Sequence, residues 1–154
     1  MNACGELTTA STPTVAEGPG PTAGPGSTFT FEQGLFGFPD DHDFVLMATP
    51  HPAVFRLQSA DRPELAFLVA DPFAFFKGYW VDLPDTDVKR LGATRPEDVA
   101  ILVTITFSSD PARLSTANLQ APLAINVRTR RSRQVILLRA GYGVREAIDL
   151  RLDH

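Results

Sequence analysis

The sequence predicts a mainly β protein, a small antiparallel β-barrel-like domain with one short helix. Three observations support this fold class. About eight short apolar runs are separated by clusters of Gly, Pro, Asp and Ser, the residues that favour turns. Only one segment combines the start and stop signals of a helix. The chain has 154 residues, 44% of them hydrophobic, which is enough for one domain with its own core.

Residues 1–28 differ in composition from the rest of the chain. Gly, Pro, Ser, Thr and Ala dominate this segment, which leaves little apolar surface to offset the entropy lost on ordering. We therefore expect 1–28 to be a flexible tail and 29–154 to be the folded β domain. The tail lacks the basic start and apolar centre of a secretory signal. No apolar run approaches the ~18–20 residues that a membrane helix needs.

The first half of the domain predicts short strands separated by turns. Apolar residues that alternate or run together, many of them β-branched or aromatic, mark each strand. An aromatic loop, 71–78, precedes the last of them. The expected strands are Phe29–Phe31, Phe44–Met47, Val54–Leu57, Ala66–Ala70 and Tyr79–Leu83.

The one expected helix is Asp85–Leu91. Asp85 follows a proline and is predicted to be the N-cap, basic residues occupy the last turn, and Gly92 ends the helix. A helix of two turns is not stable by itself in water. We therefore expect it to dock on a sheet through Val88 and Leu91.

The second half of the domain predicts three further strands. Val99–Phe107 has the strongest signal, because its β-branched residues are dense. Leu123–Val127 and Gln134–Leu138 are expected to form a hairpin across the loop Arg128–Arg133, which is too basic to be buried. Residues 140–154 fit either a short helix or a frayed end. Together, these elements imply an antiparallel barrel or sandwich.

Charge is distributed unevenly along the chain. The net charge is −4, yet the first 55 residues contain six acids and no Lys or Arg, and all 14 basic residues follow. The acidic total argues against a dedicated nucleic-acid binder. The uneven distribution indicates that different surfaces meet different partners. Any acidic working face should involve Glu32 and Asp40–Asp43.

Residues able to support catalysis or bind a metal do not form a recognisable pattern. His42, His51 and His154 are not at a metal-ligand spacing, and Cys4 lies in the expected tail. No nucleophile elbow is present, and a small hydrolase would need a nucleophile–base pair that the sequence does not reveal. The sequence therefore predicts no enzyme activity and no metal site.

The acids Asp40, Asp41 and Asp43 resemble part of a cation site. A calcium loop needs further oxygen ligands and a closing glutamate, and apolar residues follow instead. We therefore predict a solvated acidic turn.

Three features suggest recognition of a partner, each with a simpler structural interpretation. Aromatic residues in loops, including Phe36, Phe75 and Phe76, either plug the barrel ends or form an exposed patch. Asn118 and Gln120 either bond local backbone or form a polar surface. The loop Arg128–Arg133 is a solvated hairpin tip, a contact for an acidic protein, or an RNA-binding site.

Several ordered motifs resemble the family of flagellar assembly factor FliW. The segment Ser115–Pro122, continued by Leu123-Ala124-Ile125-Asn126, and the segment Phe31–Phe38 carry the resemblance most clearly. It spans roughly Phe29 to Leu138. Supporting segments occur in the expected order: Phe55–Ser59, Leu65–Phe67, Asp71-Pro72-Phe73 with Phe75-Phe76, and Pro96–Val99.

The resemblance implies a β-barrel-like protein of the bacterial cytoplasm without catalytic residues or a cofactor. FliW-like proteins bind the translational regulator CsrA away from its RNA site, which relieves repression of flagellin mRNA, and they also bind flagellin. We expect no membrane partner and no direct nucleic-acid partner; direct RNA binding through 128–133 is the alternative. The residues expected to contact partners are Glu32, Phe36, Asp40, Asp41, Asp43, Phe75, Phe76, Asn118 and Gln120.

The chain departs from the family pattern at two places. Members usually begin with an N-terminal strand, and here the Gly/Pro-rich tail occupies that place, with Thr8–Thr12 as a weak substitute. The family commonly has Pro in an Ile-Pro-Gly-Phe loop, where this chain has Leu35-Phe36-Gly37-Phe38. Because Phe36 lacks the fixed φ of proline and exposes more apolar surface, we expect partner affinity to differ.

Overall fold

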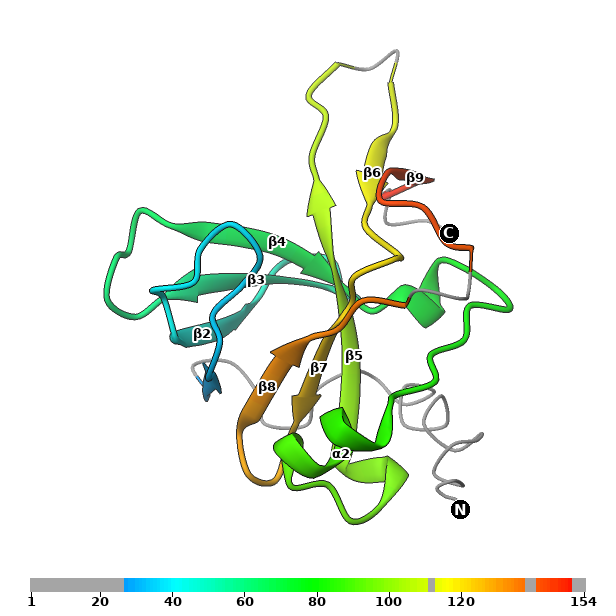
Figure 1. Ribbon diagram of the computed structural model, residues 1–154. Helices are drawn as coiled ribbons and strands as arrows, with labels where there is room; N and C mark the ends of the chain where they lie inside the picture. The colour runs from blue at the N-terminus through cyan, green and yellow to red at the C-terminus, as the bar shows by residue number, and fades with distance from the viewer. Residues whose placement is uncertain (1–26, 111–112, 138–140, 151–154) are drawn as a thin grey trace.

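The chain folds into a closed β-barrel, which confirms the predicted fold class (Figure 1). The computed structural model describes residues 27–110, 113–137 and 141–150. Within them, nine strands form one sheet in the order β4-β3-β2-β1-β8-β7-β5-β6-β9, and pairing of β4 with β5 closes seven of them into a barrel. The strands are β1 (Ser27–Phe31), β2 (Asp43–Ala48), β3 (Val54–Ser59), β4 (Ala66–Ala70), β5 (Val99–Thr106), β6 (Ser115–Ala117), β7 (Leu123–Asn126), β8 (Arg131–Gln134) and β9 (Glu146–Ile148).

The sheet is mixed rather than purely antiparallel. β1 and β8 pair in parallel, with Thr30 opposite Arg131 and Phe31 opposite Ser132, whereas the other recorded pairings are antiparallel. This parallel pair joins the first half of the chain to the second. It therefore places the loop that follows β1 beside the end of β8, where the Phe36 N–H donates to the side-chain oxygen of Gln134 at 2.8 Å.

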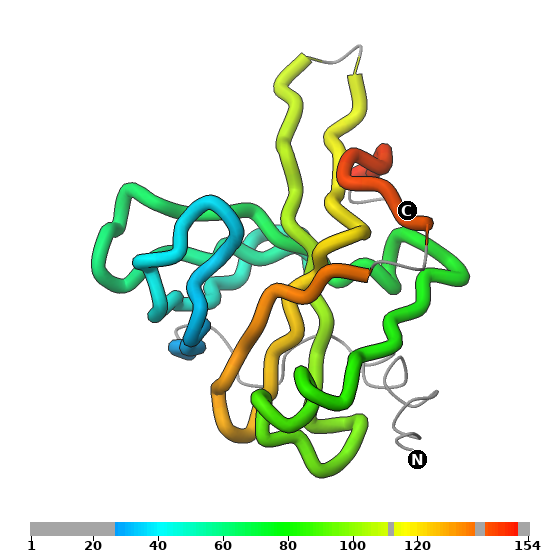
Figure 2. Tube along the Cα trace, in the orientation of Figure 1, coloured from blue at the N-terminus to red at the C-terminus, as the bar shows by residue number. Residues whose placement is uncertain are grey.

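β5 runs along the length of the molecule, with β2, β3 and β4 to one side and the chain around 71–83 to the other (Figure 2). Its residues from Val99 to Val103 are buried on both faces. Leu102 belongs to the core cluster that contains Phe29 and Phe44, whereas Ile101 and Val103 belong to a second cluster. The two faces of β5 thus serve two cores, which explains why its apolar run is nearly continuous.

Helix α2 (Asp85–Leu91) has the predicted bounds but a different N-cap. Pro84 is the N-cap residue and makes no side-chain capping bond, and Asp85 is the first helical residue. Proline before the helix fixes a suitable φ, and Asp85 instead supplies a favourable charge in the first turn. Gly92 ends the helix at φ 69°, as expected from the sequence, and Leu91 is buried. The other helical elements of the described residues are two 3₁₀ turns, η2 (Pro72–Ala74) and η3 (Pro96–Asp98).

The expected strand Tyr79–Leu83 is wrong. Tyr79, Val81 and Leu83 are buried, so the alternation correctly reported one buried side. The segment, however, satisfies its polar groups outside the sheet. The Tyr79 hydroxyl donates to the Leu119 carbonyl at 2.7 Å, and the Trp80 N–H donates to the Tyr142 hydroxyl at 2.9 Å.

The basic hairpin is shifted relative to the prediction. β8 covers Arg131–Gln134, so Arg131 and Arg133 belong to a strand and only 127–130 form the turn. Burial of Val135 and Leu137 produced the misleading alternation after β8. The short β9 corrects the expected helix or frayed end over 140–154 within its described residues.

At the N-terminal side, β1 begins at Ser27, two residues before the expected domain start. The Thr8–Thr12 segment and Cys4 lie outside the described residues. No helix in the described part of the chain is long and apolar enough to cross a membrane.

Candidate protein-binding surface

The loop between β1 and β2 presents an aromatic side chain on a tight turn. Leu35 and Phe38 bond each other through both backbone groups, at 3.2 and 2.7 Å, with Phe36 and Gly37 between them. Gly37 has φ 90°, which suits the third position of a type II turn. Phe36, at the second position, is 54% exposed. Phe36 is thus presented to solvent at a fixed position.

Gln134 connects this turn to the Asn118–Pro122 segment. Its side-chain oxygen accepts from the Phe36 N–H at 2.8 Å, and its amide nitrogen donates to the Ala121 carbonyl at 3.0 Å. Ile136, two residues beyond Gln134, is 47% exposed. The structure therefore brings Phe36 close to a segment about 85 residues later in the chain, and sequence reasoning identified neither Gln134 nor Ile136.

Asn118 has a local role. Its side-chain oxygen accepts from the backbone N–H groups of Gln120 and Ala121, both at 3.1 Å. This is the Asx-type turn that the structural interpretation of the segment predicts. The side chain of Gln120 is partly exposed beside it. Asn118 thus shapes the segment, and Gln120 remains available at its surface.

Asp41 corrects the expectation of a fully solvated acidic turn. It is 4% exposed and forms a salt bridge with Arg62, whose Nε donates to Asp41 Oδ1 at 3.0 Å. The hydrogen bond from Arg62 lowers the pKa of Asp41 and outweighs the opposing effect of burial. The Ser59 hydroxyl also donates to Asp41, at 3.4 Å. Asp41 therefore anchors the loop and does not offer an exposed charge to a partner.

Two of the remaining acids of this region lie near Arg62. Asp40 and Glu64 both interact electrostatically with Arg62. The backbone carbonyl of Asp43 accepts from the Ala60 N–H of the next loop at 2.8 Å, whereas its carboxylate accepts from the Thr30 hydroxyl of β1 at 2.8 Å. Asp61 precedes Arg62 in that next loop. Because Arg62 is paired with Asp41, these acids keep an excess of negative charge. We call Asp40, Asp43, Asp61 and Glu64 the acidic surface.

Sequence reasoning found half of the acidic surface. Asp40 and Asp43 were predicted, whereas Asp61 and Glu64 were not singled out. The missed signal was their position in the loop between β3 and β4, which pair with each other, while β3 also pairs with β2. Antiparallel pairing of β2 with β3 returns this loop to the start of β2.

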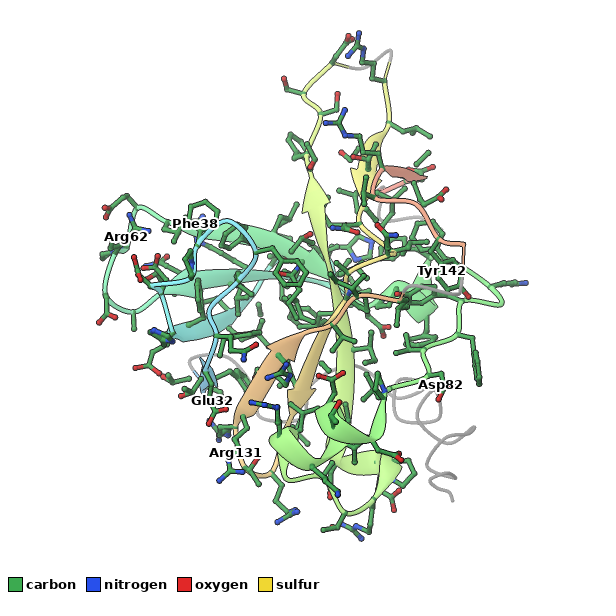
Figure 3. All side chains as sticks on the ribbon, viewed as in Figure 1. Glu32, Phe38, Arg62, Asp82, Arg131 and Tyr142 are labelled. Carbon is green, nitrogen blue, oxygen red and sulfur yellow. The ribbon has the colours of Figure 1, made fainter. Side chains whose placement is uncertain are left out.

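Glu32 lies apart from the acidic surface, on the side of β8. Thr30 is paired with Arg131 across the parallel ladder, so Glu32 follows closely beside β8. Figure 3 shows Glu32 and Arg131 on the same side of the molecule, with Phe38 and Arg62 further away. Glu32 is exposed. It therefore borders a basic region rather than extending the acidic one.

Phe75 and Phe76 match the interpretation of loop aromatics as core plugs. Both are partly buried and pack against the core cluster that contains Val54 and Tyr79. The ring of Phe75 also lies 5.4 Å from that of His51. Phe36, in contrast, follows Leu35 of the other core cluster. The structure thus does not gather these three aromatics into one packed cluster.

Asp71 organises the aromatic loop at η2. Its side chain caps the turn by accepting from the Phe73 N–H at 3.0 Å. Burial raises the pKa of Asp71 to about 6, although the hydrogen bond from Phe73 opposes the shift. The position of this carboxyl explains the loop conformation without a ligand.

Two of the three histidines have local roles. His42 Nδ1 lies 2.9 Å from the Phe31 carbonyl, and His51 Nδ1 accepts from the Ala53 N–H at 3.0 Å. His154 lies outside the described residues. Among the residues that the structure describes, no group of three metal-ligating side chains comes together.

The basic segment Arg128–Arg133 is less free than its sequence suggests. Arg133 is mostly buried, with 17% of its side chain exposed, and pairs with Asp87 of α2 at 2.7 Å. Arg128 pairs with the buried Asp98 at 3.4 Å. The expectation that the whole segment is an exposed loop is therefore wrong, because residues 131–133 belong to β8, where Ser132 is buried and Arg133 mostly so.

The architecture and the motifs agree with one known family. A family model described as FliW protein matches residues 21–148. The chain belongs to the FliW family. This result confirms the resemblance carried by 31–38 and 115–126. As a member of this family, the protein is a flagellar assembly factor, and its partners are expected among proteins.

Individual FliW proteins are similar over most of their length. The flagellar assembly factor FliW of Geobacillus thermodenitrificans is 42% identical over 112 residues, covering 73% of this chain and 77% of the relative. That of Bacillus licheniformis is 40% identical over 122 residues, covering 79% and 85%. A crystal structure of the flagellar assembly factor FliW matches with a TM-score of 0.74 and 39% identity, covering 78% and 84%. The barrel is thus the FliW fold.

Proposed function

We propose that this FliW protein is a non-catalytic binding protein of the bacterial cytoplasm that captures a CsrA-type translational regulator and also binds flagellin. Capture of the regulator relieves repression of flagellin mRNA. The observation that carries the proposal is that the exposed Phe36 and the acidic Asp40 lie on one loop, which the Asp41–Arg62 pair anchors. Exposed apolar residues next to charge are typical of protein-recognition sites.

Electrostatics gives this surface a mode of action. A regulator that binds RNA carries basic groups, and an acidic surface attracts it and speeds association. Once bound, the same negative charge disfavours RNA phosphate nearby by like-charge repulsion. If the regulator and flagellin compete for the protein, the free flagellin concentration sets how much regulator is captured, by mass action alone. The proposed function therefore needs neither a cofactor nor a reaction.

The proposed contact residues fall into three groups by their role. Phe36 is the proposed apolar anchor, with Ile136 and Gln120 beside the segment that Gln134 links to it. Asp40 and Asp43 supply charge, and Asp41 holds the loop. Residues with a more peripheral proposed role are Glu32, Phe75, Phe76 and Asn118.

Calorimetric titration with the purified cognate regulator and with flagellin tests the proposal. We expect a complex with each partner at micromolar concentrations or tighter, and flagellin should release the regulator. Phe36→Ala should weaken binding roughly tenfold or more, because exposed aromatics at interfaces are frequent hot spots. The double variant Asp40→Asn/Glu64→Gln should weaken it less and reduce its salt dependence.

Phe107→Ala is the matched control, since Phe107 is also an exposed phenylalanine, at 64%, just beyond β5. Its affinity should stay within about twofold of the parent. Absence of a complex with either partner would overturn the proposed function. Equal losses for Phe36→Ala and Phe107→Ala would overturn the placement of the surface.

A further inference from the structure

A second charged surface lies where α2 meets the turn between β7 and β8. Lys89 and Arg90 are exposed in the last turn of α2, Arg130 is exposed in the turn, and Arg131 is exposed at the start of β8. Among the ion pairs of the described residues, none involves these four side chains. We call Lys89, Arg90, Arg130 and Arg131 the basic surface.

Hydrogen bonds join the two elements of the basic surface. The amide of Asn126 donates to the Leu91 carbonyl at 2.8 Å, and the Thr129 hydroxyl donates to the same carbonyl at 3.1 Å. Arg131 extends over the end of the helix, because its Nη1 lies 3.4 Å from the position of a Cβ on Gly92. The last turn of α2 and the β7–β8 turn therefore form one continuous surface.

The turn itself is held in one conformation. The side-chain oxygen of Asn126 accepts from the N–H groups of Arg128 and Thr129, at 2.9 and 3.0 Å. Arg130 has φ 69°, and it is the one non-glycine residue with positive φ in the described part of the chain. Its guanidinium lies 5.5 Å from the centre of the Phe29 ring. A basic surface ordered in advance loses little conformational entropy when it binds.

Neighbouring arginines of this region are neutralised within the chain. Arg133 pairs with Asp87, Arg128 pairs with Asp98, and Arg95 pairs with both Asp98 and Glu97. Asp98 is 3% exposed, so its charge is directed to the residues that cover it. Internal carboxylates thus engage these three arginines and leave the basic surface with unneutralised charge.

We propose that the basic surface binds an acidic segment of a protein partner, through pairing of its carboxylates with the two arginines and two α2 cations. Guanidinium groups bind carboxylates in bidentate geometry, and the consecutive residues Arg130 and Arg131 supply two such groups. This surface is separate from the acidic surface of the proposed function. The protein would then hold a basic partner and an acidic partner at different places.

RNA fits the basic surface less well. Proteins that hold single-stranded RNA combine cations with aromatic side chains on which bases stack. The exposed aromatics of the described residues are Phe36, Trp80 and Phe107, and none belongs to 85–98 or 126–133.

Fluorescence anisotropy of the full-length protein with two labelled probes tests this proposal. The probes are an oligoglutamate peptide and a single-stranded RNA of equal net charge. We expect the peptide to bind in a salt-dependent manner, and at least about tenfold more tightly than the RNA. Arg130→Gln/Arg131→Gln should weaken peptide binding roughly tenfold, and adding Lys89→Gln/Arg90→Gln should weaken it further.

Lys77→Gln/Arg145→Gln is the matched control, since both residues are exposed and lie outside this surface. Its peptide affinity should match that of the parent protein, and circular dichroism should show that every variant is folded. Three results would overturn the proposal: no peptide binding by the parent, equal weakening in the control, or tighter binding of RNA than of peptide. The regulator titration is an independent readout, and we expect the arginine variants to leave it unchanged.

Discussion

The β1–β2 loop and the β7–β8 turn both pack over a buried carboxylate, yet they carry surface charge of opposite sign. In each, a buried carboxylate lies under an arginine: Asp41 under Arg62, and Asp98 under Arg128. In the first region Arg62 is paired with Asp41, and the other acids leave a net negative charge. In the second, Asp98 and Asp87 are paired with arginines, and the other basic residues leave a net positive charge. The surface charge of each region is thus set by what the buried pair leaves over, and not by its composition alone.

The two regions also differ in how they hold the backbone. The first uses glycine at positive φ, at Gly34 and Gly37. The second uses a buried asparagine, Asn126, and places Arg130 itself at positive φ. A glycine turn depends on the absence of a side chain, whereas an asparagine turn depends on the hydrogen bonds of one. Substitutions in the two regions should therefore lower the free energy of unfolding for different reasons.

The largest expected effect comes from Gly34→Ala. Its Cβ would overlap the Phe38 carbonyl oxygen and come within 2.7 Å of Pro39 Cα, at a φ of 67° that disfavours alanine. We expect a loss of roughly 3 kcal/mol or more of unfolding free energy, from backbone strain and overlap together. Urea denaturation measures it.

Gly37→Ala is the control for that experiment. Gly37 also has positive φ, but an added Cβ meets nothing within 4 Å. Gly37→Ala should lower the free energy of unfolding by only about 1 kcal/mol, because alanine disfavours positive φ. Similar losses for the two variants would contradict the close approach at Gly34.

A second large effect is expected from Asn126→Ala. The fully buried amide makes three hydrogen bonds, one to the Leu91 carbonyl and two from backbone N–H groups. Its removal leaves buried groups without partners, so we expect a loss of roughly 2–4 kcal/mol, measured by urea denaturation.

Asn118→Ala provides the comparison at the other region, because Asn118 accepts two similar N–H bonds but is partly exposed. Water can replace its oxygen, and the expected loss is about 1 kcal/mol. If Asn126→Ala were no more harmful than Asn118→Ala, the tie between α2 and the β7–β8 turn would not matter for stability.

The smallest effects are expected in the dependence of stability on pH. The pKa of Asp41 is lowered by Arg62; that of Asp98 is lowered because hydrogen bonds, first from Thr94 and then from Arg128, outweigh its burial. Each carboxylate stabilises the fold above its unfolded pKa of about 4, and this contribution is lost as pH falls through the lowered folded value. Asp41→Asn and Asp98→Asn should therefore reduce the loss of stability below about pH 4, measured by denaturation at a series of pH values.

Asp71 should show the opposite sign. Its pKa is raised by burial to about 6, so the folded state holds a proton that the unfolded state releases. Stability from this group is greatest below about pH 4 and falls as pH rises to 6, by roughly 1–2 kcal/mol after allowance for solvent screening. Asp71→Asn, which can still cap η2 through its side-chain oxygen, should remove this decrease. A decrease that persists in the variant would rule out Asp71 as its source.

Most of the fold was predictable because strands leave a local signature. Ala66–Ala70 and Asp85–Leu91 were predicted with their observed bounds, since apolar runs and helix signals depend on neighbours in sequence. Beyond β8, the Val135 and Leu137 N–H groups still bond the Pro122 and Gln120 carbonyls, so the expected strand differs from the structure mainly in its bounds. Tyr79–Leu83 misled the prediction for another reason. Alternating burial reports that one side faces the core, but a strand also needs a partner for its backbone.

The candidate site was predictable only in part, for a related reason. Phe36 and Asp40 could be found, because a loop aromatic and an acidic turn are visible locally. Gln134 could not, because its role is to join Phe36 to Ala121. Phe36 lies 98 residues before Gln134 in the chain, and Ala121 lies 13 residues before it. Long-range contacts of this kind leave no local pattern.

The sequence by itself determined the β class, the helix Asp85–Leu91, the family, and the uneven distribution of charge. Only the tertiary structure decided which charges are paired within the chain and which remain exposed. Asp41 meets Arg62 from 21 residues away, and Arg133 meets Asp87 from 46 residues away. The physical reason is that a charge buried on folding must find an opposite charge or hydrogen-bond donors, and barrel closure determines which ones are within reach.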